Sequence, residues 1–218
     1  LTSAQIGSMG TAQIVALGSK AIGAIETADL AGLSTGQMAA LRSTQVPGLS
    51  ADQVANLSTA QLMAMSSAAL NVFNTAQVVA LTTAQASSLG SAQIAALTTN
   101  NIAALETADF AVLATAAVAA LSTAQVKALS TNEVVALTST QAGALGSAQV
   151  AALSANAIAA LETVDLNQLK TAGIAAFATA QVAALTTAQV NSLATASLAA
   201  LNTAGIAALS TNQVVALT

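Results

Sequence analysis

The only clustered carboxylates of the chain form three pairs, in which a Glu precedes an Asp by three positions. The pairs are Glu26/Asp29, Glu106/Asp109 and Glu162/Asp165. Each pair offers hard oxygen ligands of the kind that Ca²⁺ takes in proteins, although two carboxylates are few for a tight calcium site. Acidic residues in the first turn of a helix also interact favourably with its free N–H groups and positive dipole end. We favour this helix-start interpretation, and we predict no metal site.

Catalytic chemistry has few candidate groups in this sequence. The chain contains no His, Cys, Tyr or Trp, which removes the usual general bases, thiol nucleophiles and soft metal ligands. Its many Ser and Thr residues have no basic partner nearby to activate them. We therefore predict that the protein is not an enzyme, with no catalytic residue, no cofactor and no small-molecule substrate.

Charge argues against a nucleic-acid partner. The formal net charge is −4, and the four basic residues are scattered along the chain: Lys20, Arg42, Lys127 and Lys170. A surface that follows phosphates needs clustered Lys and Arg. No run of about 20 apolar residues is present, so we also expect no membrane-spanning segment.

The elements that must position these residues come from an eight-residue repeat. From residue 1, 27 consecutive octads fit the template L-S/T-T-A-Q-V-A-A with no insertion or deletion. The first position is always large and apolar. The third is Ser or Thr except at Ala51 and Ala155, and the sixth is always apolar, with Ala at Ala86 and Ala142. Such a short fixed period predicts a stacked repeat architecture.

Each octad carries the signals of a helix start, as in residues 121–128. Ser122 and Gln125 have the spacing of a capping box, and Leu121 with Val126 has that of a hydrophobic staple. We therefore predict an all-α, elongated solenoid of very short helices, one per octad. The N-cap falls at either the second or the third position. If it falls at the third, the second position is the junction between two helices. The glycines found there (Gly10, Gly18, Gly90, Gly146) would suit a junction that needs relaxed backbone angles.

Two other folds deserve comparison. A single continuous helix is excluded, because eight residues leave about 80° of drift per octad and the apolar stripe would circle the helix. A β-solenoid stays open as the alternative, with positions one, three, six and eight inside and two, four, five and seven outside. The abundance of Ala and Gln, which are poor strand residues, counts against it.

The array shows a second, longer period but no linker. Residues 81–136 and 137–192 are tandem blocks of seven octads, which need not match a structural coil. We predict one continuous domain over residues 1–218. Because the repeat is in register at both ends, we expect the chain to be part of a longer repeat protein.

The octad strings LTTAQA (81–86), LTTAQV (185–190) and LSTAQV (121–126) resemble the repeat arrays of large bacterial secreted or surface proteins of the adhesin type. The resemblance implies an extracellular or cell-surface stalk or fibre, and it assigns no functional residue. The predicted outer face, rich in Ala, Gln, Asn, Ser and Thr, suits self-association or binding to a cell-surface or matrix polymer. A repetitive ice-binding or polysaccharide-binding surface is the alternative function.

Overall fold

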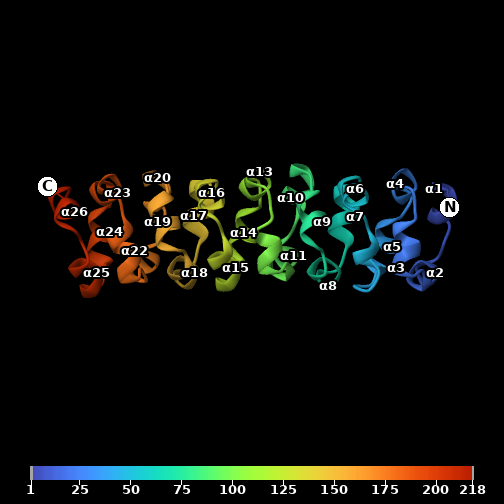
Figure 1. The fold of residues 1–218 in the computed structure, drawn as a ribbon, viewed down its shortest axis with the longest axis horizontal. Helices are drawn as coiled ribbons and strands as arrows, with labels where there is room; N and C mark the ends of the chain where they lie inside the picture. Colours follow the sequence, from blue (N-terminus) through green and yellow to red (C-terminus); the bar gives the residue numbers. More distant parts are fainter. Residues whose placement is uncertain (1, 218) are drawn as a thin grey trace. The chain divides into compact units, whose positions relative to one another are not determined.

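The computed structural model describes residues 2–217 as a succession of helices of three to six residues. The helices fall into two compact units, residues 1–117 and residues 118–218. No strand occurs among residues 2–217. The prediction of an all-α solenoid with one very short helix per octad is therefore confirmed, and the β-solenoid alternative is wrong (Figure 1).

The first unit contains thirteen α-helices and one 3-10 helix, η1. These are α1 (Ser3–Gly7), α2 (Thr11–Ala16), α3 (Ser19–Gly23), α4 (Thr27–Leu30), α5 (Thr35–Ala40), η1 (Val46–Gly48), α6 (Ala51–Ala55), α7 (Thr59–Ala64), α8 (Ser67–Asn71), α9 (Thr75–Val79), α10 (Thr83–Ser88), α11 (Ser91–Ala96), α12 (Thr99–Ile102) and α13 (Thr107–Ala111). The next helix, α14 (Thr115–Ala119), contains the division between the units.

The second unit continues with the same element. Its helices are α15 (Thr123–Ala128), α16 (Thr131–Val135), α17 (Ser139–Ala144), α18 (Ser147–Ala152), α19 (Ala155–Ala160), α20 (Thr163–Leu166), α21 (Thr171–Ala175), α22 (Thr179–Ala184), α23 (Thr187–Ser192), α24 (Thr195–Ala200), α25 (Thr203–Ala207) and α26 (Thr211–Val215). None of the helices described within residues 2–217 is long and apolar enough to cross a membrane.

The second octad position is the N-cap of every α-helix except α14, whose cap is not described, whereas the N-cap of η1 is Gln45, at a fifth position. In α15, the Ser122 hydroxyl accepts the Gln125 N–H at 3.2 Å, and the Gln125 side chain accepts the Ser122 N–H at 2.8 Å. This confirms the predicted capping box and assigns the third position to the first turn of the helix. The return bond needs only the backbone of the N-cap, since Ala178 N–H donates to Gln181 Oε1 at 2.7 Å. The second position therefore tolerates many side chains.

The predicted role of the second-position glycines is wrong. Gly10, Gly18, Gly90 and Gly146 have φ between −81° and −70° and ψ between 157° and 167°. These are the extended angles of the serine N-caps, such as Ser122 at φ −69° and ψ 159°. Glycine is tolerated at this position because no side-chain cap is required, and its conformational freedom is not used.

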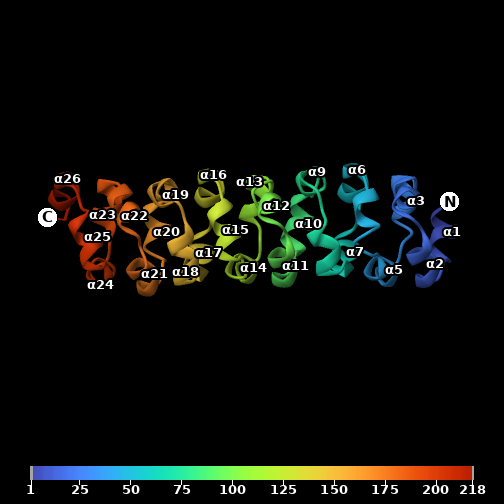
Figure 2. The same cartoon turned by 60° about the horizontal axis from the view of Figure 1, so that its bottom comes forward.

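Three octads, or 24 residues, make one coil of each unit. Every main contact between elements joins helices three octads apart, such as α2 with α5 and α5 with α7 in the first unit. In the second unit, α15 packs on α18, and α18 packs on α21 (Figure 2). The seven-octad blocks therefore do not correspond to whole coils.

The core of each unit is built from the first and sixth octad positions. In α7 and its flanks, Leu57 and Leu62 are both buried. The three aromatic residues at these positions, Phe73, Phe110 and Phe177, are buried, as predicted. The interior of each coil is thus filled by large apolar side chains, most of them aliphatic.

One coil contact of the first unit requires glycine. Gly23 ends α3, and Gly48 ends η1, which packs against α3. A Cβ atom on Gly23 would overlap the carbonyl oxygen of Gly48, and one on Gly48 would overlap the carbonyl oxygen of Ser19. Larger residues cannot be placed here without separating the two helices.

Candidate functional site

The fifth octad position forms a ladder of buried amides that connects the coils. In the first unit, Gln85 Nε2 donates to the carbonyl oxygens of Val54 and Leu57 at 2.8 and 2.7 Å. In the second unit, Gln189 Nε2 donates to Ile158 and Leu161, both at 2.8 Å. The acceptors lie 31 and 28 residues before each glutamine. Nearly all of these glutamines are buried, so the prediction that Gln contributes to the outer face is wrong.

Each amide satisfies two different helix ends. The last carbonyl groups of a helix have no partner within that helix, and the bend that follows is buried here. The glutamine Nε2 donates to these carbonyls of an earlier coil, while its Oε1 accepts the N-cap N–H of its own helix. A single side chain therefore starts one helix and closes the bend beside it. The glutamines with this pattern are Gln37, Gln53, Gln61, Gln77, Gln85, Gln93, Gln149, Gln181, Gln189 and Gln213. Gln45 makes the same bonds to an earlier coil, but it is itself the N-cap of η1, and its Oε1 accepts the N–H of Arg42.

The two members of each predicted carboxylate pair lie in different environments. Glu26, Glu106 and Glu162 are exposed N-cap residues without a side-chain cap bond. The Asp residues replace the glutamine at the fifth position, and they contact the helix start three octads earlier. Asp29 Oδ1 accepts the Ser3 N–H at 2.7 Å and the Ser3 hydroxyl at 2.8 Å, and Asp165 Oδ1 accepts the Ser139 hydroxyl at 2.6 Å.

Asp29 therefore caps a helix start, but that of the preceding coil and not of its own helix, and Asp165 binds a first-turn hydroxyl of the preceding coil. A fifth-position Gln donates to a bend, whereas a fifth-position Asp, shorter by one methylene, accepts from the neighbouring first turn. Within residues 2–217, no group of three or more acidic side chains comes together around a possible metal position.

Two buried carboxyl groups are incompletely satisfied. Asp109 Oδ2 and Glu133 Oε1 have no hydrogen-bond partner among the described residues. Burial raises the pKa of Asp109, and the nearby Glu106 carboxylate adds to this rise, while a hydrogen bond from Thr83 opposes it. Burial also raises the pKa of Glu133 above its usual value, against the lowering effect of hydrogen bonds from Ser130.

Glu133 makes the capping-box bond of a fifth-position residue but not the bond to an earlier coil that a glutamine makes. As predicted, it replaces Gln in the box, where Glu133 Oε2 accepts the Ser130 N–H at 2.7 Å. Its other oxygen takes the place of the amide nitrogen of a glutamine. A glutamate has no proton to donate there when it is ionised, which accounts for the unsatisfied oxygen.

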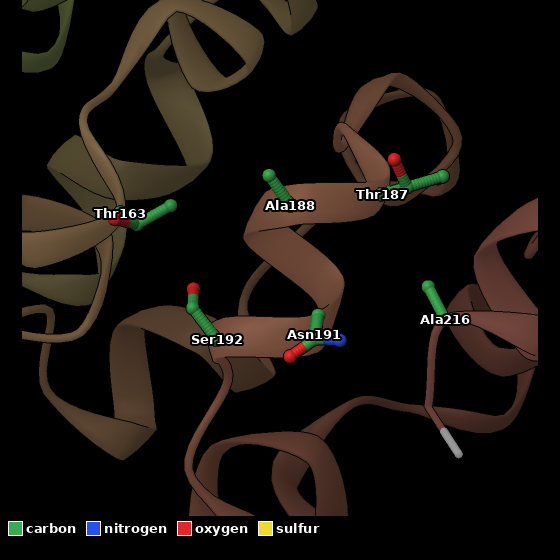
Figure 3. A pocket seen from close by; sticks show the side chains of 6 residues that line it. All are labelled: Thr163, Thr187, Ala188, Asn191, Ser192 and Ala216. Atoms are coloured by element: carbon green, nitrogen blue, oxygen red, sulfur yellow. The ribbon is translucent and has the colours of Figure 1, made fainter.

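The described surface includes one shallow hollow in the second unit. Its lining comes from successive coils on one face, namely Thr163 of α20, residues of α23, and Ala216 beside α26 (Figure 3). The α23 residues are Thr187, Ala188, Asn191 and Ser192. Thr163 and Thr187 occupy the same octad position in neighbouring coils, so the hollow is part of a repeating Thr and Ala surface.

Comparison with known protein families connects this geometry to a repeat family. The family model for the ALTTAQ repeat matches seven segments, residues 22–59, 55–91, 71–99, 102–139, 126–155, 158–195 and 192–218. The chain belongs to the ALTTAQ repeat family. Among curated proteins, none matches the chain. In the ALTTAQ octad, the glutamine that follows T-A is the buried amide that joins the coils.

This second role of the ALTTAQ glutamine was not predicted from the sequence. The signal that could have revealed it is the persistence of Gln where the N-cap cannot complete a capping box. Gln149 follows Gly146, and Gln181 follows Ala178, yet both keep the amide. At these two octads the glutamine keeps its return bond to the N-cap N–H but has no N-cap side chain to bind its own N–H, so its retention points to a further partner.

Proposed function

We propose that this ALTTAQ array is a structural repeat segment of a bacterial extracellular adhesin or filament protein, acting as a stalk or a self-associating fibre. The protein is secreted or held at the cell surface, and it performs no catalysis. The observation that carries the proposal is the amide ladder, because it devotes the most regular polar side chain of the sequence to joining coils. A chain organised in this way is suited to extending and bearing load.

Location is the most direct test of this proposal. Antibodies raised against the array should label intact bacteria that produce the parent protein, with no need for permeabilisation. A cytosolic protein labelled in the same cells is the control, and it should remain unlabelled until the cells are opened. Labelling of the array only after permeabilisation would contradict the proposal.

Mechanical behaviour provides a second test. A stacked array with contacts only between neighbouring coils is expected to open under force in small steps. Stretching single molecules should therefore give several small length increments. One large unfolding event for the whole chain would argue against a segmental stalk.

A repetitive binding surface for ice or polysaccharide is the second candidate function. The exposed Thr163 and Thr187, which repeat between coils along the shallow hollow, favour it. Thermal hysteresis of the purified chain would support ice binding, and replacement of Thr187 by Lys should reduce it. A purified chain without thermal hysteresis would remove the ice-binding alternative.

A further inference from the structure

One complete coil of the second unit has no amide at the fifth octad position. This coil spans residues 153–176, and its fifth-position residues are Ala157, Asp165 and Gly173. Nowhere else in the sequence do three successive octads lack both Gln and Asn at this position. The ladder of amides that joins neighbouring coils is therefore interrupted within the array, over one full coil.

The contact between this coil and the preceding one, residues 129–152, is called the amide-free joint below. It consists of three helix pairs, α16 with α19, α17 with α20 and α18 with α21. Ala157 and Gly173 have no polar side-chain atom. The Asp165 carboxylate accepts the Ser139 hydroxyl at 2.6 Å, where a glutamine would donate. The fifth-position side chains of residues 153–176 therefore give the preceding coil no amide donor.

Three carbonyl oxygens in the preceding coil lose their usual donor as a result. In the following joint, Gln181 Nε2 donates to the carbonyl oxygen of Leu153, and Gln189 Nε2 to that of Leu161, both at 2.8 Å. The corresponding carbonyl oxygens of the amide-free joint belong to three buried residues, Leu129, Leu137 and Leu145. Within residues 2–217, these oxygens also accept no backbone N–H. Water can bind them once the joint opens, so their lack of a partner favours the open state.

Close apolar packing takes the place of the missing amides. A Cβ atom on Gly173 would lie 3.1 Å from Val150 Cγ2, and one on Gly143 would lie 3.2 Å from the carbonyl oxygen of Gln168. Both contacts cross the amide-free joint. Dispersion contacts of this kind are individually weak and are lost over a small separation. The joint is thus held by apolar contact where its neighbours also have buried hydrogen bonds.

We infer that the amide-free joint is a hinge, which opens before the neighbouring coil contacts made by Gln149, Gln181 and Gln189. In the open form, residues 153–176 separate from residues 129–152, while the amides of Gln181 and Gln189 still hold them to the following coil. Each coil of a solenoid contacts only its neighbours, so one joint can open while the others stay closed.

The hinge is a property of the array and goes beyond the proposed function, because it does not depend on where the protein is located. In a stalk under load, it is the first contact to give way. The tandem blocks repeat this arrangement in part. Residues 97–120, 56 residues earlier, have Asn101, Asp109 and Ala117 at the three fifth positions. Each block therefore contains one coil without a fifth-position glutamine.

Thiol labelling of the full chain tests the inference, and the absence of Cys from the sequence makes each introduced thiol unique. Val150→Cys places a thiol in the amide-free joint. Val126→Cys is the matched control at the same octad position, on α15, which packs against α18 with the Gln149 amide. Both valines are at most 1% exposed. A buried thiol reacts with a disulfide reagent only when its contact opens, so Val150→Cys should react about 100-fold faster than Val126→Cys.

An isosteric substitution should close the hinge. Asn101, at a fifth position of the first unit, donates to the carbonyl oxygen of Phe73, 28 residues earlier, at 2.8 Å. Asp165→Asn supplies the same donor for Leu137, also 28 residues earlier, and should slow labelling of the Val150→Cys thiol about tenfold. Glu162→Gln is the matched control, because it removes a charge at the exposed N-cap of the same helix. It should leave the labelling rate unchanged.

Equal labelling rates for the two thiols would overturn the inference, as would a Val150→Cys rate with the same urea dependence as complete unfolding. Hydrogen exchange of the unsubstituted chain gives a measurement that no variant can disturb. The N–H groups of α19 and α20 should exchange faster than those of α7 and α10, whose coil contacts contain the amides of Gln61 and Gln85. Equal or slower exchange in α19 and α20 would contradict the hinge. An array found only inside cells would contradict the proposed function and leave the hinge intact.

Discussion

Gln13 and Gln85 occupy the same octad position and have opposite environments. Both occupy the fifth octad position after T-A, and both accept the N–H of their N-cap residue, at 2.7 and 2.8 Å. Gln13 lies in the first coil and is exposed, whereas Gln85 is 2% exposed and donates to carbonyl oxygens of an earlier coil. The comparison separates what one octad does alone from what stacking adds.

Replacing each glutamine by alanine measures that difference directly. Gln85→Ala should destabilise the first unit by about 3 kcal/mol, since it leaves the buried carbonyl oxygens of Val54 and Leu57 without this donor and removes the return bond to Thr82. Gln13→Ala loses only the return bond at an exposed helix start, and should cost about 0.5 kcal/mol. Urea unfolding followed by circular dichroism provides both values. Equal losses in the two variants would show that coil contacts contribute little.

Two glycines allow the same comparison for packing, because Gly23 lies against a neighbouring coil and Gly36 does not. Gly23→Ala should destabilise the first unit by about 1–3 kcal/mol, because its methyl group would overlap the Gly48 carbonyl in the neighbouring coil. Gly36→Ala, in α5, meets only the Ser34 hydroxyl at 3.9 Å, and should stabilise the helix by about 0.5–1 kcal/mol. Thermal unfolding of the two variants should therefore shift in opposite directions. A stabilised Gly23→Ala would contradict the close approach of α3 and η1.

The sequence is sufficient to predict the capping box within one octad, although the N-cap stayed open between two positions and the role assigned to the second-position glycines was wrong. Ser122, Gln125, Leu121 and Val126 are close in the chain, so the capping box and the helix start follow from local spacing. The number of octads per coil does not follow, because near-identical octads fit any stacking register equally well. The second partner of Gln85 lies 28 or 31 residues away, and the hydroxyl bound by Asp165 lies 26 residues away. Such partners become visible only once the coil is closed.

Glu133 is a fifth-position residue that keeps the bond to its N-cap N–H but lacks the N–H donor with which Gln85 binds an earlier coil. Glu133→Gln should stabilise the protein at neutral pH by about 1 kcal/mol, because it removes a buried charge and supplies an N–H donor. The folded-state pKa of Glu133 is raised, so protonation of Glu133 stabilises the folded state. This stabilisation is fully present below the usual Glu pKa and is lost as pH rises through the folded pKa.

The advantage of Glu133→Gln should therefore shrink as the solution is acidified, and urea unfolding at a series of pH values measures this change. Glu162→Gln, at an exposed N-cap, is the matched control and should change stability by less than about 0.5 kcal/mol at each pH. A Glu133→Gln variant no more stable than the parent at neutral pH would mean that the buried oxygen finds a partner in solution.

The N-cap side chain should give the smallest effect, because it acts within one helix only. Ala178→Ser adds an acceptor for the Gln181 N–H, as Ser122 provides for Gln125 at 3.2 Å, and should stabilise the second unit by about 0.5–1 kcal/mol. The gain is limited because Ala178 N–H already donates to Gln181 Oε1 at 2.7 Å. Thermal unfolding of Ala178→Ser and of the reverse change, Ser122→Ala, should give shifts of opposite sign and similar size. If either shift were as large as that of Gln85→Ala, helix starts would contribute as much to stability as the amides that join the coils. The difference in stability expected between the Gln13 and Gln85 variants would then not measure the contacts between coils.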